Sequence, residues 1–215
     1  MTRLVVATGN PGKLREFAAA LASAGIEVIG LEALADRSPV EETGSTFEAN
    51  ARLKAEGYSL RTPHLVLADD SGLEVDALGG EPGVQSARYG GEPARSGREP
   101  GARSTSPCAV VLDDAGRCRL VLDRLRGVPP ERRTARFRCV LAVARAGRTL
   151  SVFEGAVEGR ILDAPRGSNG FGYDPIFFHE EEGRAFAELS PAEKESLSHR
   201  GQAIRRLLEG DWLHS

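Results

Sequence analysis

The sequence predicts a mixed α/β fold, and two observations indicate it. Its N-terminal part alternates short apolar runs with segments of helical periodicity, separated by turn residues. Its later part contains two long runs of β-forming residues, which Ala146-Gly147 joins as a hairpin. The 215 residues match the size of one domain, which we expect to span 1–215.

The elements follow from apolar spacing and capping patterns. A strand over 4–7 is expected to lead through a glycine-containing turn into a helix over 13–24, in which Leu14, Phe17 and Leu21 recur at helical spacing. The same criteria predict, in order, a strand over 27–31, a helix over 46–60, a strand over 65–68, a short helix or strand over 120–125, strands over 135–145, 149–158 and 175–178, and a C-terminal helix after Ser190. The Gly-, Pro-, Arg- and Ser-rich segment 90–107 predicts a disordered insertion loop.

Composition excludes several classes of function. Three cysteines without CxxC spacing argue against a disulfide framework or a zinc site. The net charge of −3 gives no polyanion-binding surface overall, and the Arg-rich stretch 88–148 carries no nucleic-acid-binding motif, so we expect no nucleic-acid partner. We find neither a signal peptide nor the ~18 apolar residues of a membrane span, so we expect a cytoplasmic protein without a membrane partner.

The turn after the first strand is a candidate anion-binding loop. It reads Thr8-Gly9-Asn10-Pro11-Gly12-Lys13. Glycines allow close approach of the backbone, and the N–H groups of a helix start together with a lysine suit a phosphate. The spacing is neither that of a Walker A loop nor G-x-G-x-x-G, and a plain strand-to-helix turn would explain it equally well.

Two acidic pairs, Glu41-Glu42 and Asp69-Asp70, are candidate magnesium ligands. Adjacent carboxylates repel each other, and Mg²⁺ is commonly held by one or two carboxylates together with substrate phosphates. Asp69-Asp70 is the stronger candidate because we expect it at the end of a buried strand. Turn formation is the competing interpretation for Asp69-Asp70, and a solvated loop is the competing one for Glu41-Glu42.

The C-terminal third offers groups that can bind a nucleobase. Phe171-Gly172-Tyr173-Asp174 follows a glycine-rich loop, and an aromatic ring in such a loop can stack on a base. Lys194, His199 and Arg200 supply hydrogen-bond donors near the last helix. Core packing of the phenylalanine and simple solvation of the His and Arg are the alternatives. Together with the loop and the acidic pairs, these groups describe a Mg²⁺-dependent enzyme acting on a nucleotide.

Several long stretches resemble the inosine triphosphate pyrophosphatase family, also called the Ham1-like family. They are ATGNPGK (7–13), EETGSTFEANARLKA (41–55), ADDSGLEVDALGGEPGVQSARYGGE (68–92), ARFRCVLA (135–142), GSNGFGYDPIFF (167–178) and AELSPAEKESLSHRGQA (187–203). The resemblance implies an elongated, two-lobed α/β fold with the active site in a cleft between the lobes. It also implies a homodimer with one Mg²⁺ per subunit, which hydrolyses ITP, dITP and XTP to the monophosphate and pyrophosphate.

The resemblance implies roles for particular residues. Glu42 and Asp70 match the magnesium ligands, with Asp69 able to share that role, and Asp70 matches the general base. The remaining matches are to substrate-binding positions: Thr8, Gly9, Asn10, Pro11, Gly12, Lys13, Lys54, Ser71, Phe171, Gly172, Tyr173, Asp174, Lys194, His199 and Arg200.

One region departs from the family pattern. After Tyr89 the family usually continues into an acidic, Asn-containing helix, whereas this chain has a longer Arg- and Pro-rich segment and then Arg117-Cys118-Arg119. Three other readings stay open: a Maf-like pyrophosphatase with another base preference, a nucleotide-binding module without catalysis, and a nucleic-acid-binding role for 88–148. The intact set of acids and lysines argues against the second.

Overall fold

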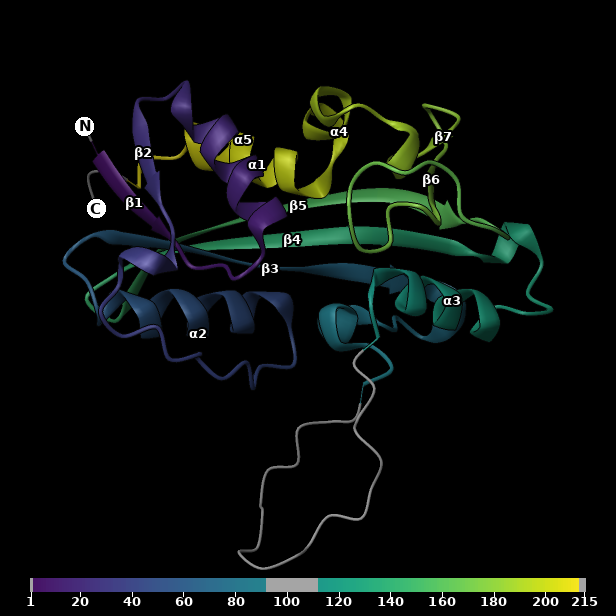
Figure 1. Cartoon of the computed structure of the whole chain (residues 1–215), viewed down its shortest axis with the longest axis horizontal. Helices are drawn as coiled ribbons and strands as arrows, with labels where there is room; N and C mark the ends of the chain where they lie inside the picture. Colours follow the sequence, from purple (N-terminus) through teal and green to yellow (C-terminus); the bar gives the residue numbers. More distant parts are fainter. Residues whose placement is uncertain (1, 92–111, 213–215) are drawn as a thin grey trace, which may run out of the picture.

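The computed structural model describes residues 2–91 and 112–212, and there the chain forms one seven-stranded mixed sheet (Figure 1). The strand order is β2-β1-β3-β4-β5-β6-β7. The strands are β1 (Thr2–Val6), β2 (Ile26–Ile29), β3 (Leu65–Val75), β4 (Thr134–Arg145), β5 (Arg148–Ile161), β6 (Phe177–His179) and β7 (Arg184–Ala185). β1 pairs in parallel with β2 and β3, and the other pairings are antiparallel.

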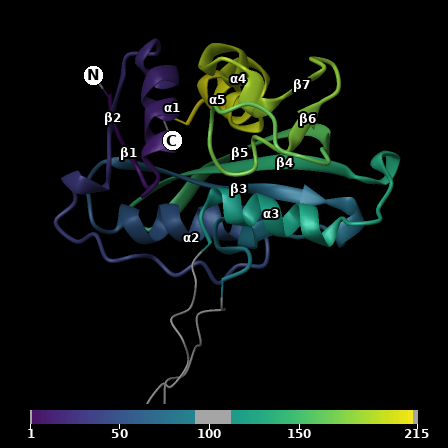
Figure 2. The same cartoon turned by 45° about the vertical axis from the view of Figure 1, so that its right-hand side comes forward.

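Helices cover both sides of this sheet. They are α1 (Pro11–Ala22), α2 (Phe47–Ser59), α3 (Asp114–Arg124), α4 (Pro191–Leu197) and α5 (His199–Glu209). In both views α1, α4 and α5 lie above the strands, and α2 and α3 lie below them (Figures 1 and 2). No helix among the described residues is long and apolar enough to cross a membrane.

Side-chain caps fix where the helices begin. The Asn10 side chain accepts hydrogen bonds from the N–H groups of Gly12 and Lys13, so α1 begins at Pro11 rather than at the predicted residue 13. Thr46 caps α2 and Ser198 caps α5 in the same way. The helix predicted over 46–60 is confirmed to within one residue at each end.

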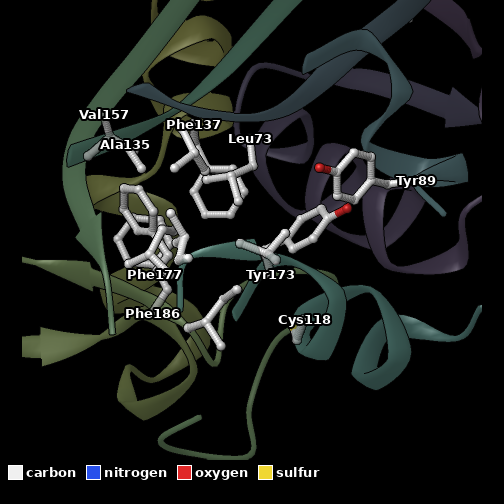
Figure 3. Packing of buried hydrophobic residues seen from close by; sticks show 14 of the residues in the cluster. Leu73, Tyr89, Cys118, Ala135, Phe137, Val157, Tyr173, Phe177 and Phe186 are labelled. Atoms are coloured by element: carbon white, nitrogen blue, oxygen red, sulfur yellow. The ribbon is translucent and has the colours of Figure 1, made fainter. Parts of the chain in front are cut away.

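The apolar core has three main parts. One packs between the sheet and α1 and α5, a second packs between the sheet and α2, and a third fills the other end of the elongated molecule. In the third, Phe137 packs against Phe177 and Phe186, with ring centroids 4.5 Å and 5.8 Å away, and Tyr173 and Cys118 belong to the same cluster (Figure 3). This divided core and mixed sheet confirm the predicted α/β fold.

The structure corrects the prediction for β3. We expected a strand over 65–68 that ends at Asp69-Asp70, but β3 continues to Val75 and the acidic pair lies inside it. β4 pairs with β3 all the way from Val66↔Ala144 to Val75↔Ala135. On the other edge of β3 the pairing with β1 stops at Leu67, which leaves the edge beside the acidic pair open to α1.

The region after β3 holds a second difference. α3 runs over Asp114–Arg124, whereas the sequence predicted only a short helix or strand over 120–125. Asp113 caps this helix by accepting from the Gly116 N–H. The predicted disordered loop over 90–107 lies outside the described residues, apart from residues 90 and 91.

Gly155 lets α5 approach β5 closely. A Cβ atom at this position would lie 2.0 Å from the His199 carbonyl oxygen and 2.8 Å from the Ala203 nitrogen. Because the backbone must shift to accept that atom, Gly155→Ala is expected to lower the free energy of unfolding by about 2–3 kcal/mol in urea denaturation. Gly9→Ala is the control, since its Cβ would meet nothing within 4 Å. Equal stabilities of the two variants would contradict this packing argument.

Candidate active site

The loop between β1 and α1 forms one wall of the site. β1 ends at Val6, and Thr8 Oγ1 accepts a hydrogen bond from the Asn10 N–H at 3.1 Å. Asn10 then caps α1, whose first turn carries Lys13. The loop therefore brings a helix N-terminus and an ammonium group to the open edge of β3, an arrangement that attracts anions.

Asp69 and Asp70 lie on opposite faces of the sheet because successive side chains of a strand alternate. Leu65 and Leu67 pack on the α1 and α5 side, and Val66 and Ala68 pack on the α2 side. The contacts of the two aspartates continue this alternation, with Lys13 and Arg200 on one side and Asn50 and Lys54 on the other. The two carboxylates thus occupy different environments.

Asp69 is enclosed by cations. Its Oδ2 atom lies 2.6 Å from Lys13 Nζ, 3.8 Å from Arg200 Nη2 and 3.1 Å from the Ser71 hydroxyl, which donates to it. Burial alone would raise the pKa of Asp69, but Lys13, Arg200 and Lys54 outweigh burial and hold this pKa well below its usual range. Asp69 therefore stays ionised and anchors these cations.

Asp70 is held differently. Asn50 Nδ2 donates to its Oδ2 atom at 3.1 Å, and Lys54 Nζ lies 3.7 Å from its Oδ1 atom. Burial raises the pKa of Asp70, and Lys54 and the Asn50 hydrogen bond only partly offset it. This carboxylate is short of positive charge, as a metal ligand or a general base has to be.

Glu42 completes this side of the site and makes it suitable for Mg²⁺. Glu42 Oε1 lies 3.5 Å from Lys54 Nζ, which also contacts Asp70, and Glu42 Oε2 lies 3.4 Å from Arg88 Nη2. Within residues 2–91 and 112–212 no three His, Cys, Asp or Glu side chains gather to hold a metal ion by themselves. Two carboxylates in one pocket suit Mg²⁺, which takes its other ligands from water and phosphates. Asp69, already bound to Lys13, suits this role less well.

These groups line two pockets that share Asn10, Lys13, Ser71 and Ala87. The first, which we call the carboxylate pocket, is lined by Thr8, Gly9, Glu42, Lys54, Asp69 and Asp70 besides the shared residues. The second, which we call the aromatic pocket, is lined by the segment 171–174, Lys194, His199, Arg200 and Phe137, and also by Ser86, Asp114 and Arg117. Because of the shared residues, one elongated ligand can occupy both pockets.

Phe171 is held at the aromatic pocket by cations and by its backbone. Lys194 Nζ lies 4.5 Å from its ring centroid, and the Arg200 guanidinium carbon lies 5.6 Å from it. Asp174 Oδ2 accepts from the Phe171 N–H at 2.8 Å and from Lys194 Nζ at 2.5 Å. These contacts fix the position of the ring in the lining of the pocket.

His199 and Arg200 bring buried, partly unsatisfied polar groups to this pocket. His199 stacks on Phe137, with centroids 4.8 Å apart, and burial lowers its pKa well below the ordinary value, so the imidazole is neutral. Arg200 is paired with Glu16 and donates to Ser71 Oγ at 3.1 Å. His199 Nδ1 and Arg200 Nε are buried without a hydrogen-bond partner in the described structure, and such groups favour a ligand that pairs with them.

Comparisons with known proteins agree with this geometry. A sequence profile of the Ham1 family matches residues 4–210. The chain belongs to the Ham1 family. It is 50% identical to a dITP/XTP pyrophosphatase of Geobacillus kaustophilus over 209 residues, which cover 97% of this chain and 94% of that protein.

Solved structures of Ham1 proteins have the same fold. The Ham1 protein of Staphylococcus aureus superposes with a TM-score of 0.79 at 38% identity, and the match covers 97% of each chain. A protein of Mycobacterium abscessus described as a nucleoside-triphosphatase / dITP/XTP pyrophosphatase superposes with a TM-score of 0.71 at 41% identity, covering 97% of this chain and 100% of that one.

The Ham1 fold brings nearly all the predicted site residues to these two pockets. Pro11 and Gly12 are the exceptions, because they form the first turn of α1 and line neither pocket. Gly12 lies on the far side of Phe171, in a neighbouring pocket that also touches Lys194 and Arg200. Tyr173 lines the aromatic pocket, but its hydroxyl donates to the Ser86 carbonyl oxygen at 2.8 Å and its ring belongs to the core.

Sequence reasoning missed four residues that complete the site: Asn50, Glu16, Asp114 and Arg117. Asn50 lies one helical turn before Lys54 on α2, and Glu16 lies three residues after Lys13 on α1. Helical spacing from the two predicted lysines is a signal that points to both. For Asp114 and Arg117 no such signal exists, because only tertiary packing brings α3 to the pocket.

Proposed function

We propose that this chain hydrolyses the non-standard purine nucleotides dITP, ITP and XTP to the monophosphate and pyrophosphate, using Mg²⁺. That it is a nucleoside-triphosphate pyrophosphatase follows from its Ham1 membership and its relative at 50% identity. The observation that carries the finer proposal is the pair of joined pockets, one with carboxylates and lysines and one with an aromatic ring and buried donors. A nucleoside triphosphate has the matching shape and chemistry.

The carboxylate pocket would take the triphosphate. Lys13, Lys54 and the start of α1 supply positive charge for the phosphates, and Lys13 is oriented by Asp69. Glu42 and Asp70 would hold Mg²⁺, which when bound would neutralise charge developing on the phosphates. Asp70, with its raised pKa, would orient a water molecule and accept its proton during attack between the α- and β-phosphates.

The aromatic pocket would select the base. A purine ring would stack on Phe171, and the 6-oxo group of hypoxanthine or xanthine would accept from the donors of Arg200. Adenine carries a 6-amino group instead, which would leave these buried donors unpaired at a cost of about 1–3 kcal/mol for each. The selection against ATP thus has a physical basis in groups of this chain.

Two further properties are part of the proposal. The family resemblance leads us to propose a homodimer that acts in the cytoplasm, where it would remove these nucleotides from the nucleotide pool. A pyrophosphatase of other nucleotides and a non-catalytic binding module are the alternatives. The unpaired N–H donor of Arg200 favours a 6-oxo base over the first, and the presence of Glu42 and Asp70 argues against the second.

Pyrophosphate release across a panel of nucleotides tests the proposal. With Mg²⁺ present, kcat/KM for ITP, dITP and XTP is expected to exceed that for ATP by at least about tenfold, the equivalent of one buried unpaired donor, and to exceed that for GTP, CTP and UTP as well. EDTA is the control and is expected to stop the reaction. Preference for a pyrimidine or a standard purine would contradict the base assignment, and binding without turnover would favour the binding module.

A further inference from the structure

Helix α3 forms a wall of the aromatic pocket and holds its base-stacking loop. Asp114 Oδ2 accepts from the Gly172 N–H at 2.7 Å, and Cys118 Sγ lies 3.3 Å from the Gly172 carbonyl oxygen. The N–H and the carbonyl group of Gly172, the residue after Phe171, are thus both fixed by α3. This is the segment in which the sequence departs from the family pattern, and Arg117 on it lines the pocket.

The aromatic pocket is rich in donors and poor in open acceptors. Asp114 and Asp174 are the carboxylates that line it. Asp114 accepts from the Gly172 N–H and from Arg117 Nη2, and Asp174 accepts from Lys194 and the Phe171 N–H. Each carboxylate thus already pairs with a cationic side chain and a backbone N–H, which weakens it as an acceptor for an amino group on a bound base.

Arg117 is a second arginine at this pocket, and it comes from α3 whereas Arg200 comes from α5. Its side chain is 15% exposed and makes hydrogen bonds to the Leu112 carbonyl oxygen and to Asp114, which use only two of its five N–H groups. In two views α5, which carries Arg200, lies above the strands and α3 lies below them (Figures 1 and 2). The two arginines thus border the pocket from different directions.

A purine that enters between these arginines exposes two different positions. The shared residues Asn10, Lys13 and Ser71 fix the end toward the phosphates, so the sugar-bearing N9 atom faces them. The C6 and C2 substituents then point away from the sugar on either side of N1. With the 6-oxo group at Arg200, the C2 position is directed to the α3 wall.

We propose that Arg117 reads the C2 substituent of the bound purine and so separates xanthine from guanine nucleotides; this rests on the proposed function. The 2-oxo group of xanthine accepts a hydrogen bond from the guanidinium. Xanthine nucleotides are largely anionic at neutral pH, with the charge shared by the 2-oxo group and N3, which strengthens this contact. The 2-amino group of guanine would instead place one donor against another.

Three variants test this role. In Arg117→Ala, kcat/KM for XTP is expected to fall by about tenfold or more relative to ITP, which has only hydrogen at C2. In Arg117→Gln, the amide oxygen can accept from a 2-amino group, so the GTP-to-XTP ratio of kcat/KM is expected to rise. Arg119→Ala removes an exposed arginine from the same helix and is expected to leave all the ratios unchanged.

Calorimetric binding of the monophosphates separates recognition from chemistry. XMP is expected to lose affinity in Arg117→Ala, while IMP keeps it. The inference would be overturned if the wild type is active on these substrates and both Arg117 variants keep its XTP-to-ITP and GTP-to-XTP ratios of kcat/KM. That result would leave the proposed function intact. Equal losses for IMP and XMP would overturn it as well, since they would show that Arg117 only supports the Phe171 loop. A wild type that is inactive on every purine triphosphate would refute the proposed function itself, and unchanged XMP affinity in Arg117→Ala would then refute the inference separately.

Discussion

Asp70→Asn is expected to lower kcat for pyrophosphate release by about 10³-fold, because the amide cannot accept the proton of the attacking water. Substrate affinity, measured by calorimetry with a non-hydrolysable analogue, should change much less, since Lys13 and the start of α1 remain in place. Glu74→Gln is the matched control, because Glu74 lies further along β3 on the same face as Asp70 and lines neither pocket of the site. Near wild-type turnover in Asp70→Asn would remove Asp70 from the role of general base.

The same variant is expected to be more stable than the wild type when EDTA removes divalent metals. Burial raises the pKa of Asp70 in the folded protein, so at neutral pH the folded state carries a charge that the unfolded state solvates better. Removing that charge should raise Tm, by about 2–4 °C for each kcal/mol gained in a chain of this size. The difference in Tm between Asp70→Asn and the wild type should decrease as the pH falls and the Asp70 carboxyl of the wild type takes up a proton. A lower Tm at pH 7 would contradict this account.

Lys13→Met is expected to produce the largest loss of stability among single changes at the site. It removes the closest cation from Asp69, whose side chain is 1% exposed, and breaking a buried pair from one side costs about 3–5 kcal/mol. We expect the lower end of that range, because Arg200 and Ser71 still contact Asp69. In urea denaturation the free energy of unfolding should fall by about 3 kcal/mol.

A second substitution distinguishes this charge effect from lost packing. Adding Asp69→Asn to Lys13→Met should restore most of the stability, because no uncompensated charge then remains buried. Arg15→Met, at an exposed site on α1, is the control for removing one positive charge. Since the pKa of Asp69 is lowered on folding, its stabilising effect is present at neutral pH and is lost in acid. The difference in the free energy of unfolding between the wild type and Lys13→Met should therefore decrease as the pH falls. A difference that does not change with pH would contradict this charge effect.

The local sequence pattern was enough to predict where the helices with a capping residue begin. The capping pattern at residues 45–48 placed α2 within one residue, and Asn10 shifted α1 by only two residues. The extent of β3 was wrong because the rule that an acidic pair ends a buried strand assumes that nothing compensates the charge. Lys13, Lys54 and Asn50 do so, and none of them is near β3 in the sequence.

The site was predictable to the extent that it consists of short motifs. The loop after β1, the acidic pair and the segment 171–174 each stand out in the sequence, and the structure brings them together. The division of labour between Asp69 and Asp70 was not predictable, because it depends on which face of the sheet each side chain meets. The contribution of α3 to the site was equally unpredictable from the sequence, since Asp114 and Arg117 reach the pocket only through the packing of α3 against Gly172.

The alternation along β3 has a consequence for the kinds of change that the chain can tolerate. Asp69 and Asp70 have different roles only because they are adjacent in a strand, so that their side chains point to opposite faces of the sheet, and because β4 fixes the register of that strand. A conservative replacement at Leu65 or Val66 alters packing locally. A one-residue insertion or deletion in that stretch either shifts the acidic pair along β4 or turns each carboxylate to the other helix layer. Libraries of single-residue indels should therefore be depleted of active clones across Leu65–Val75 far more uniformly than libraries of substitutions.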